Sequence, residues 1–345
     1  MTSTPGPREP ERFPPARRVP LPAWRDAAST EHAGLTLAVH EAGASRPGQP
    51  PVVLCHGFPE LAYSWRHQLA ALAAAGFRAI APDQRGYGAS DKPEPIPSYD
   101  IHHLCGDLVG LLDALGIEKA VFVGHDWGGF VVWAMPYLHP SRVAGVVGVN
   151  TPLMPRSPVS PLAMMRAMTG GHDEKLYITW FQEPGVAEAV LDANPALVFE
   201  KLLRSGVPME ELAKRAGPDM DMNPFRRLAE MEAFGEPIGT DAERAHYAKV
   251  FAQSGFRGGI NWYRNFDRNW ETAADIGAKP IDHPSLMVCA AWDPALRPEM
   301  AAGMPMLCRD LETVTIERCG HWTQQEHPDE LNRILIDWLR RKIGV

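Results

Sequence analysis

The stretch VFVGHDWGGF, residues 121–130, decides the fold of this chain. Its first four residues are typical of a buried strand that runs into a glycine turn, and the residues after the turn have helical character. A Gly-x-Ser-x-Gly turn in this setting holds a serine nucleophile at a sharp bend between strand and helix. Here Gly124 and Gly128 flank Asp126, so the sequence predicts the same bend with a carboxylate in the serine's place.

Strand-like and helix-like segments alternate on both sides of this bend. Short apolar runs that end in turn residues predict strands, and apolar residues at helical spacing predict the helices between them. This alternation is typical of an α/β fold whose mostly parallel sheet is covered by helices on both faces. The strands are expected within 35–43, 51–60, 77–90, 120–124, 142–150, 285–293 and 312–322, and helices at 65–76, 99–116 and 328–343.

The alternation stops after Thr151. Residues 153–281 contain helix-like stretches with many Met, Pro and Trp residues and no comparable buried strands. The sequence therefore predicts a core made of residues 29–152 and 282–345, interrupted by a helical cap, or lid, at 153–281. Residues 1–28 are rich in Pro and Arg and are expected to form a flexible tail or a loosely docked arm.

The composition indicates an ordinary globular protein. The chain has 345 residues, 45% of them hydrophobic, and a net charge of −8, which argues against a nucleic-acid partner. It has no apolar run of about 18 residues and no secretory signal, so we expect no membrane span and a cytoplasmic location. The five cysteines lack metal-like spacing and are expected to be free, mostly buried thiols, without a metal site.

Three candidate catalytic residues each follow a predicted strand: Asp126, Asp293 and His321. Because parallel strands end at one edge of the sheet, where ligands bind, these side chains are expected to meet. Nucleophile, acid and histidine is also the chain order of the α/β-hydrolase triad. An oxyanion hole is expected from the backbone N–H groups of Trp127 and of Phe58, in the loop HGFPE.

A carboxylate nucleophile restricts the chemistry. Asp126 has an unperturbed pKa near roughly 4, so it is ready to attack a saturated carbon and to form an ester with the enzyme. His321 would then activate water against that ester. Substrates with an electrophilic saturated carbon are epoxides and alkyl halides. An opened epoxide leaves as a basic alkoxide that needs an acid, and the predicted cap offers the phenols of Tyr177 and Tyr263.

The motifs HGFPE, GHDWGG, FQEPG, NWYRN and GHWTQQE resemble those of α/β-hydrolase-fold epoxide hydrolases over residues 29–345. They are particularly similar to those of the hydrolase domain of the mammalian soluble enzyme and of its bacterial relatives. The resemblance implies a nucleophile at Asp126, a base at His321 and an orienting acid at Asp293. It also implies that Tyr177 and Tyr263 activate the oxirane oxygen, without any cofactor.

The implied function is hydrolysis of an apolar epoxide to a vicinal diol. The alternatives are a haloalkane dehalogenase, which shares the ester chemistry, and a ligand-binding protein without activity. Dehalogenases often carry Asn where Phe58 stands, so this position favours an epoxide hydrolase. Monomer and homodimer remain open. Candidate pocket walls, for which core packing is the alternative, are Trp65, Phe181 and Trp322.

Three prolines bear on the geometry of this site. The resemblance implies a cis peptide bond between Phe58 and Pro59. Pro136 lies inside the helix after the bend and is expected to kink or end it. Pro294 directly follows Asp293, so it is expected to alter how that loop reaches His321.

Overall fold

The computed structural model describes residues 13–25, 31–215 and 222–344, and its centre is an eight-stranded sheet. The strand order is β1-β4-β6-β5-β7-β8-β9-β10. These strands are β1 (Arg17–Pro20), β4 (Thr36–Ala42), β5 (Val52–Cys55), β6 (Ala79–Asp83), β7 (Ala120–His125), β8 (Val143–Val149), β9 (Ser285–Ala290) and β10 (Leu311–Ile316). A separate two-stranded sheet pairs β2 (Trp24–Arg25) with β3 (Glu31–His32).

Most of the main sheet is parallel, as predicted. In the order β6-β5-β7-β8-β9-β10, each strand runs parallel to the next. Strand β4 is antiparallel to both β6 and β1. The loop between β4 and β5 holds no helix, and a parallel pair needs a long crossover connection. The first strands therefore enter the sheet antiparallel, and the βα alternation begins only at β5.

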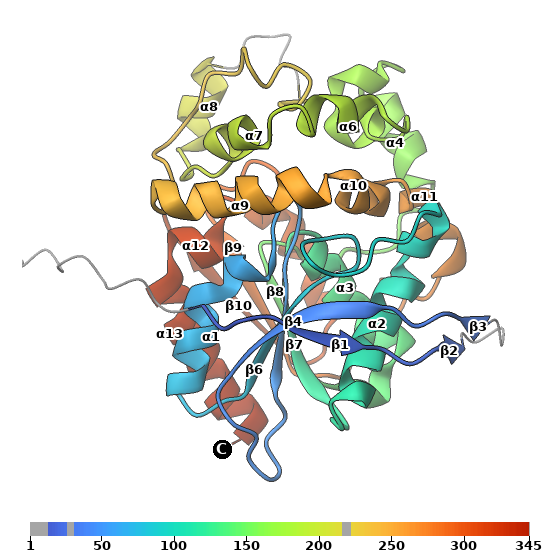
Figure 1. The fold of residues 1–345 in the computed structure, drawn as a ribbon, viewed down its shortest axis with the longest axis vertical. Helices are drawn as coiled ribbons and strands as arrows, with labels where there is room; N and C mark the ends of the chain where they lie inside the picture. Colours follow the sequence, from blue (N-terminus) through green and yellow to red (C-terminus); the bar gives the residue numbers. More distant parts are fainter. Residues whose placement is uncertain (1–12, 26–30, 216–221, 345) are drawn as a thin grey trace, which may run out of the picture.

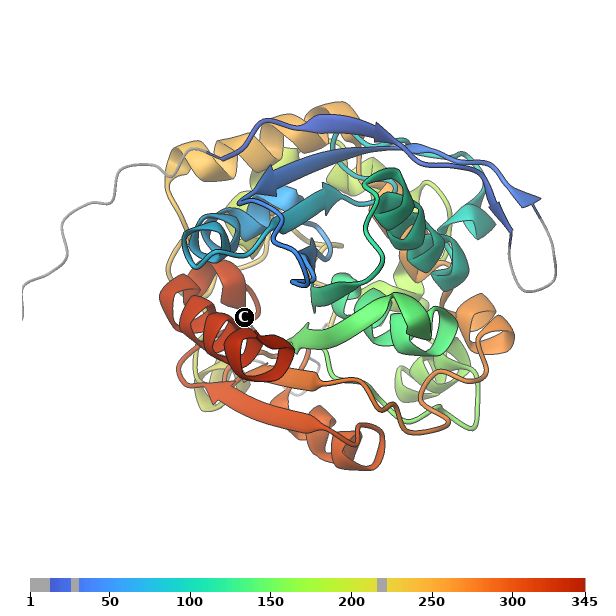
Figure 2. The ribbon, with the colours of Figure 1, turned by 90° about the horizontal axis from the view of Figure 1, so that it is seen from below.

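Helices cover both faces of the sheet (Figure 2). One face carries α1 (Arg66–Ala74) and α13 (Pro328–Leu339), and the other carries α2 (Ile101–Ala114) and α3 (Trp127–Leu138). Alternate residues of one strand pack against the helices on opposite faces of the sheet. Val52 packs in the cluster that holds Trp338, and Val53 packs in the cluster on the other face. This double burial explains why the central strands are continuous apolar runs.

The connection from β8 to β9 supplies a second, helical layer. Figure 1 shows these helices gathered on one side of the molecule, above the sheet. This matches the predicted cap, although the boundaries at residues 153 and 281 stay a prediction. The helices are α4 (Pro161–Met168), α5 (Tyr177–Trp180), α6 (Val186–Leu191), α7 (Pro195–Leu202), α8 (Met209–Arg215), α9 (Asp241–Ser254), α10 (Arg257–Tyr263) and α11 (Phe266–Thr272).

The predicted N-terminal tail is wrong for the described residues before 28. Residues Arg17–Pro20 form an edge strand that pairs with β4, with Val19 opposite Leu37 and only 2% exposed. Phe13 packs against His40, with ring centroids 4.3 Å apart. The proline and the arginines of this segment are not typical of a strand, so the strand was not predicted. Both residue types are nevertheless tolerated at a sheet edge that faces water. Residues 1–12 and 26–28 of the expected tail lie outside the described residues.

Several smaller predictions can be compared with the structure. The Phe58–Pro59 peptide bond is cis, as expected. Helix α3 continues through Pro136 and ends two residues later, at Leu138. All five cysteines are free and buried, as predicted. Among the described residues, no helix is both long and apolar enough to cross a membrane.

Candidate active site

The bend between β7 and α3 places Asp126 at the edge of the sheet. Asp126 has φ 51° and ψ −121°, a strained conformation for a residue with a side chain. A Cβ atom at Gly124 would lie 2.2 Å from the carbonyl oxygen of Gly128, and one at Gly128 would lie 2.1 Å from that of Cys55. Both glycines are therefore required for the close packing of strand and helix that maintains the bend.

The three residues from the strand ends lie together, as predicted. The Nδ1 atom of His321 lies 2.9 Å from Oδ2 of Asp293, and its Nε2 atom lies 3.8 Å from Oδ2 of Asp126. The imidazole thus stands between the two carboxylates, with one ring nitrogen facing each. This arrangement can orient the ring through Asp293 and exchange a proton on the side of Asp126.

Asp293 is fixed by four donors. Besides His321, the side-chain amide of Asn150 donates to Oδ2 at 2.7 Å, and the backbone N–H groups of Ala295 and Leu296 donate to Oδ1 at 2.9 and 3.0 Å. Burial raises the pKa of Asp293, but His321 and these hydrogen bonds outweigh it and hold the pKa well below its usual range. The proline after Asp293 does not disturb this geometry. Asn150, which follows β8 at the same sheet edge, was not predicted.

The two oxygens of Asp126 differ in their surroundings. Oδ1 accepts a hydrogen bond of 2.8 Å from the backbone N–H of Phe58, and the backbone N–H of Trp127 also interacts with the carboxylate. Oδ2 faces His321. Burial raises the pKa of Asp126, and His321, His125 and the two N–H groups offset part of that rise. The N–H of Phe58, one of the two predicted oxyanion-hole donors, therefore holds Oδ1, whereas Oδ2 faces the imidazole of His321.

His321 is strongly basic in this setting. Burial lowers its pKa, but the charge and hydrogen bond of Asp293 and the charge of Asp126 outweigh burial and raise the pKa from 6.5 to about 9. At neutral pH His321 is therefore protonated in the resting site, with the carboxyl groups of Asp293 and Asp126 on its two sides.

Two tyrosines of the inserted helices face this centre. Tyr177 begins α5 and Tyr263 ends α10, and their ring centroids are 5.8 Å apart. Burial first, and then the charge of Asp126, raise the pKa of both phenols well above its ordinary value of 10.0. Both hydroxyls therefore stay protonated at neutral pH and can donate to an oxygen bound in the cavity.

A cavity of about 250 Å³ joins these groups. A loop between α7 and α8 forms part of its wall, and most of the wall is apolar. A site of this kind suits a small apolar molecule that carries a single polar group. Among the predicted site residues, those lining the cavity are Asp126, His321, Tyr177, Tyr263, Phe58 and Trp322.

Two predicted pocket walls do not line this cavity. Trp65 ends the short 3₁₀ helix η1 (Ala62–Trp65) and is fully buried in the cluster between the sheet and α1 and α13, so its prediction as a wall is wrong. Phe181 lies directly behind the wall, with its ring 5.1 Å from that of Tyr263 and 5.6 Å from that of Phe58. Trp127 turns its indole to a second apolar cavity of about 300 Å³.

A buried polar network beneath the site was not predicted. His125 contacts Oε2 of Glu60 at 2.8 Å through Nδ1 and the backbone carbonyl of His321 at 2.6 Å through Nε2. Glu60 also accepts from Gln324 at 2.7 Å. Burial raises the pKa of Glu60, but His125 and the backbone N–H of Gly57 lower it below its usual value. The network ties the oxyanion loop to the loop that carries His321. The motif HGFPE contains Glu60, to which no role was assigned from the sequence, and this charged residue next to the oxyanion loop could have indicated the network.

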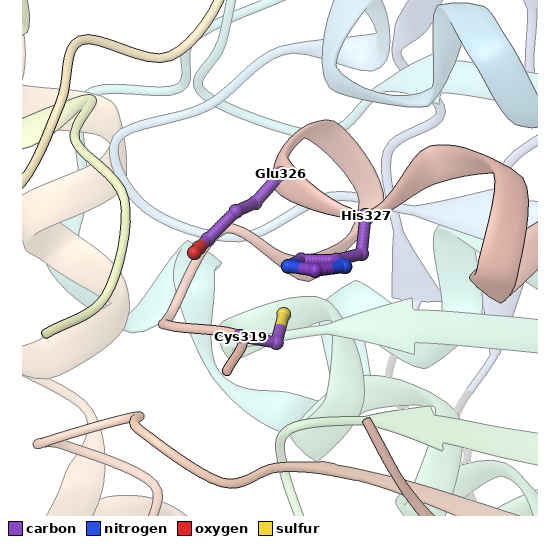
Figure 3. Close-up of side chains that lie close together, drawn as sticks. All are labelled: Cys319, Glu326 and His327. Atoms are coloured by element: carbon purple, nitrogen blue, oxygen red, sulfur yellow. The ribbon is translucent and has the colours of Figure 1, made fainter. Parts of the chain in front are cut away.

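One group of possible metal ligands stands next to this loop. Figure 3 shows Cys319, Glu326 and His327 close together, and they are the only such group in the part of the chain that the structure describes. Both carboxylate oxygens of Glu326 already accept backbone N–H groups, and burial raises the pKa of the Cys319 thiol. A zinc ligand would instead be a thiolate, so these contacts favour a structural role.

Comparison with known proteins defines the class first. Residues 50–328 match the family model described as alpha/beta hydrolase fold. This match agrees with the sheet order, the bend at Asp126 and the placement of Asp293 and His321 after later strands.

Individual relatives give a finer assignment. Epoxide hydrolase A of Mycobacterium tuberculosis is 46% identical over 319 residues, which cover 89% of this chain and 94% of that protein. Bifunctional epoxide hydrolase 2 of Rattus norvegicus is 42% identical, and the match spans 90% of this chain but 54% of the rat protein. The crystal structure of epoxide hydrolase A from Mycobacterium thermoresistibile is similar with a TM-score of 0.80 at 43% identity, covering 95% of this chain and 98% of that one. The chain belongs to the epoxide hydrolases of the α/β-hydrolase family.

Proposed function

We propose that this enzyme opens a small apolar epoxide to a vicinal diol through a covalent ester on Asp126. The observation that supports this best is the asymmetry of the Asp126 carboxylate, with Oδ1 held by the Phe58 N–H and Oδ2 free beside His321. Two protonated phenols face the same cavity. A nucleophile, an acid pair and a base therefore surround one apolar space.

In the first step, Oδ2 of Asp126 attacks a ring carbon of the epoxide. The carbon–oxygen bond of the ring breaks, and the leaving oxygen takes a proton from Tyr177 or Tyr263. The developing alkoxide is far more basic than a halide, which explains why acids are placed opposite the nucleophile. The new ester keeps Oδ1 as its carbonyl oxygen, still bonded to the N–H of Phe58, and the N–H of Trp127 lies at the same carboxyl group.

In the second step, His321 takes a proton from water, and the hydroxide adds to the ester carbon of Asp126. Negative charge then develops on Oδ1, to which the N–H of Phe58 already donates. Collapse of the tetrahedral intermediate breaks the bond between the carboxyl carbon and Oδ2. Oδ2 takes the proton of the added hydroxyl and leaves as the new oxygen of the diol, and His321 stays protonated as in the resting site. The incoming water oxygen stays on the regenerated carboxylate.

The high pKa of His321 fits this order. In the resting enzyme the charges of Asp293 and Asp126 keep His321 protonated. Ester formation removes the charge of Asp126, so one cause of the raised pKa is lost and the imidazole gives up its proton more readily. That proton restores the tyrosine that protonated the alkoxide, and neutral His321 is then the base needed for hydrolysis.

Dehalogenation is the competing activity for the same ester chemistry. The Phe58 ring packs among Phe181, Phe225 and Tyr263, so it offers no donor to a halide. The discriminating experiment compares diol formation from an aryl epoxide with halide release from a bromoalkane of similar size. Diol without halide supports the proposal, and halide without diol would overturn it.

Residues 153–281 would act as the cap that supplies the acids, and a cytoplasmic location stays a prediction.

A further inference from the structure

The segment directly after His321 touches both the inserted helices and the catalytic loops. Trp322 donates its indole N–H to the carbonyl of Leu202, at the end of α7, at 2.6 Å. Helix α12 (Thr323–Glu326) follows at once. Within it, Gln325 accepts from the hydroxyl of Tyr247 in α9 at 3.0 Å and donates to Glu60 at 3.2 Å.

Glu326 makes the most direct link between the two layers. Its Oε1 accepts the backbone N–H of Gly206 at 2.9 Å, and its Oε2 accepts the backbone N–H of Gly320 at 2.9 Å. Gly206 lies in the loop that lines the cavity, and Gly320 directly precedes His321. One carboxylate thus holds a wall of the cavity and the backbone of the residue before the catalytic histidine.

The two loops also touch without any side chain between them. A Cβ atom placed on Gly206 would lie 2.5 Å from Cα of Gly320, and the reverse substitution meets the same obstacle. Only a glycine at each position lets the backbones approach this closely. The carboxylate of Glu326 binds the N–H groups of both glycines at this contact. A shift of the Gly206 loop would therefore also move the backbone of Gly320, directly before His321.

We propose that Glu326 is a positioning residue that sets the place of His321 for ester hydrolysis according to the position of the Gly206 loop. The proposal rests on the proposed function. Two N–H donors require two acceptor oxygens, and glutamine offers one oxygen and an NH₂ group that would face an N–H. Glu326→Gln therefore breaks one of the two links while keeping the size of the side chain.

The two half-reactions should respond differently. Alkylation needs Asp126 and the tyrosines, which Glu326 does not touch, so its rate should stay within about twofold. Ester hydrolysis needs His321, and loss of a hydrogen bond to a charged group is expected to slow it about tenfold. A merely structural defect would instead lower both rates together, through a smaller folded fraction.

The test is a pair of transient measurements on the full chain with styrene oxide. Enzyme in excess gives the alkylation rate by quenching and intact-protein mass, and decay of the isolated ester gives the hydrolysis rate. Glu326→Gln is compared with Glu330→Gln. Glu330 is a neighbouring glutamate of α13, and its Oε2 lies 3.9 Å from Nδ1 of His327. Glu326→Ala, which leaves both N–H groups to water, serves if the glutamine variant does not fold. Glu326→Asp keeps the carboxylate and should restore most of the hydrolysis rate.

The inference is supported if hydrolysis alone slows in Glu326→Gln or Glu326→Ala, the ester accumulates, and Glu330→Gln behaves as wild type. Equal changes in both steps, or none in either, would overturn it. Absence of any ester in the wild-type enzyme would overturn the proposed function, and this inference with it. The two failures are therefore told apart by the wild-type trace.

Discussion

Replacing Tyr177 and Tyr263 with phenylalanine tests the acid half of the proposed mechanism. Phenylalanine keeps the ring, so the edge-on packing of both side chains against Phe181 is retained and only the hydroxyls are lost. A hydrogen bond to a group that becomes charged contributes about 2 kcal/mol, or roughly 30-fold in rate. Each single variant should therefore alkylate roughly 30-fold more slowly. The double variant, with no acid left, should lose about 4 kcal/mol, or nearly 1000-fold.

The assay is the rate of ester formation with enzyme in excess over styrene oxide, read by quenching and intact-protein mass. Tyr137→Phe is the matched control, because its hydroxyl donates to the carbonyl of Lys279 at 2.7 Å and lies away from the cavity. This control should alkylate as the wild type does. A double variant that alkylates within about tenfold of the wild type would refute the assignment of these phenols as acids.

Three further predictions concern the base, the bend and pH. His321→Gln should form the ester and fail to hydrolyse it, so its mass should rise by that of the epoxide; a folded, inactive variant without the adduct contradicts the two-step order. Gly128→Ala should lose about 3 kcal/mol of stability in urea unfolding, because its Cβ would lie 2.1 Å from the Cys55 carbonyl oxygen, and an unchanged curve counts against the required bend. The raised pKa of His321 gives stability that is fully present below pH 6.5 and lost as pH rises through about 9. The difference in unfolding free energy between wild type and His321→Gln should shrink over that window, and a constant difference rejects the raised pKa.

The catalytic centre could be predicted because its residues have fixed places in the fold. Asp126, Asp293 and His321 each follow a strand, and parallel strands deliver their ends to one edge. The local pattern and the chain order were therefore enough to predict that these three residues, which are far apart in the sequence, lie close together. The structure has all three in contact range.

Other features depend on the direction of a side chain or on distant partners. Trp65 follows the same loop as Phe58, but its helix turns it to the opposite layer, and no periodicity in so short an element reveals that. The edge strand Arg17–Pro20 lacks an apolar alternation. Glu60 and Gln324 are 264 positions apart, and their bond follows only from the packing of α12 against the oxyanion loop.

The most direct test of the ester on Asp126 is a single turnover of styrene oxide, with enzyme in excess, in water labelled with ¹⁸O. The account predicts a mostly unlabelled diol, because the new oxygen comes from Oδ2 of Asp126 and the label stays on the enzyme. Mass analysis of the peptide that carries Asp126 should then show the heavy oxygen. A fully labelled diol, with an unlabelled Asp126, would mean that water attacks the epoxide directly and would contradict the account.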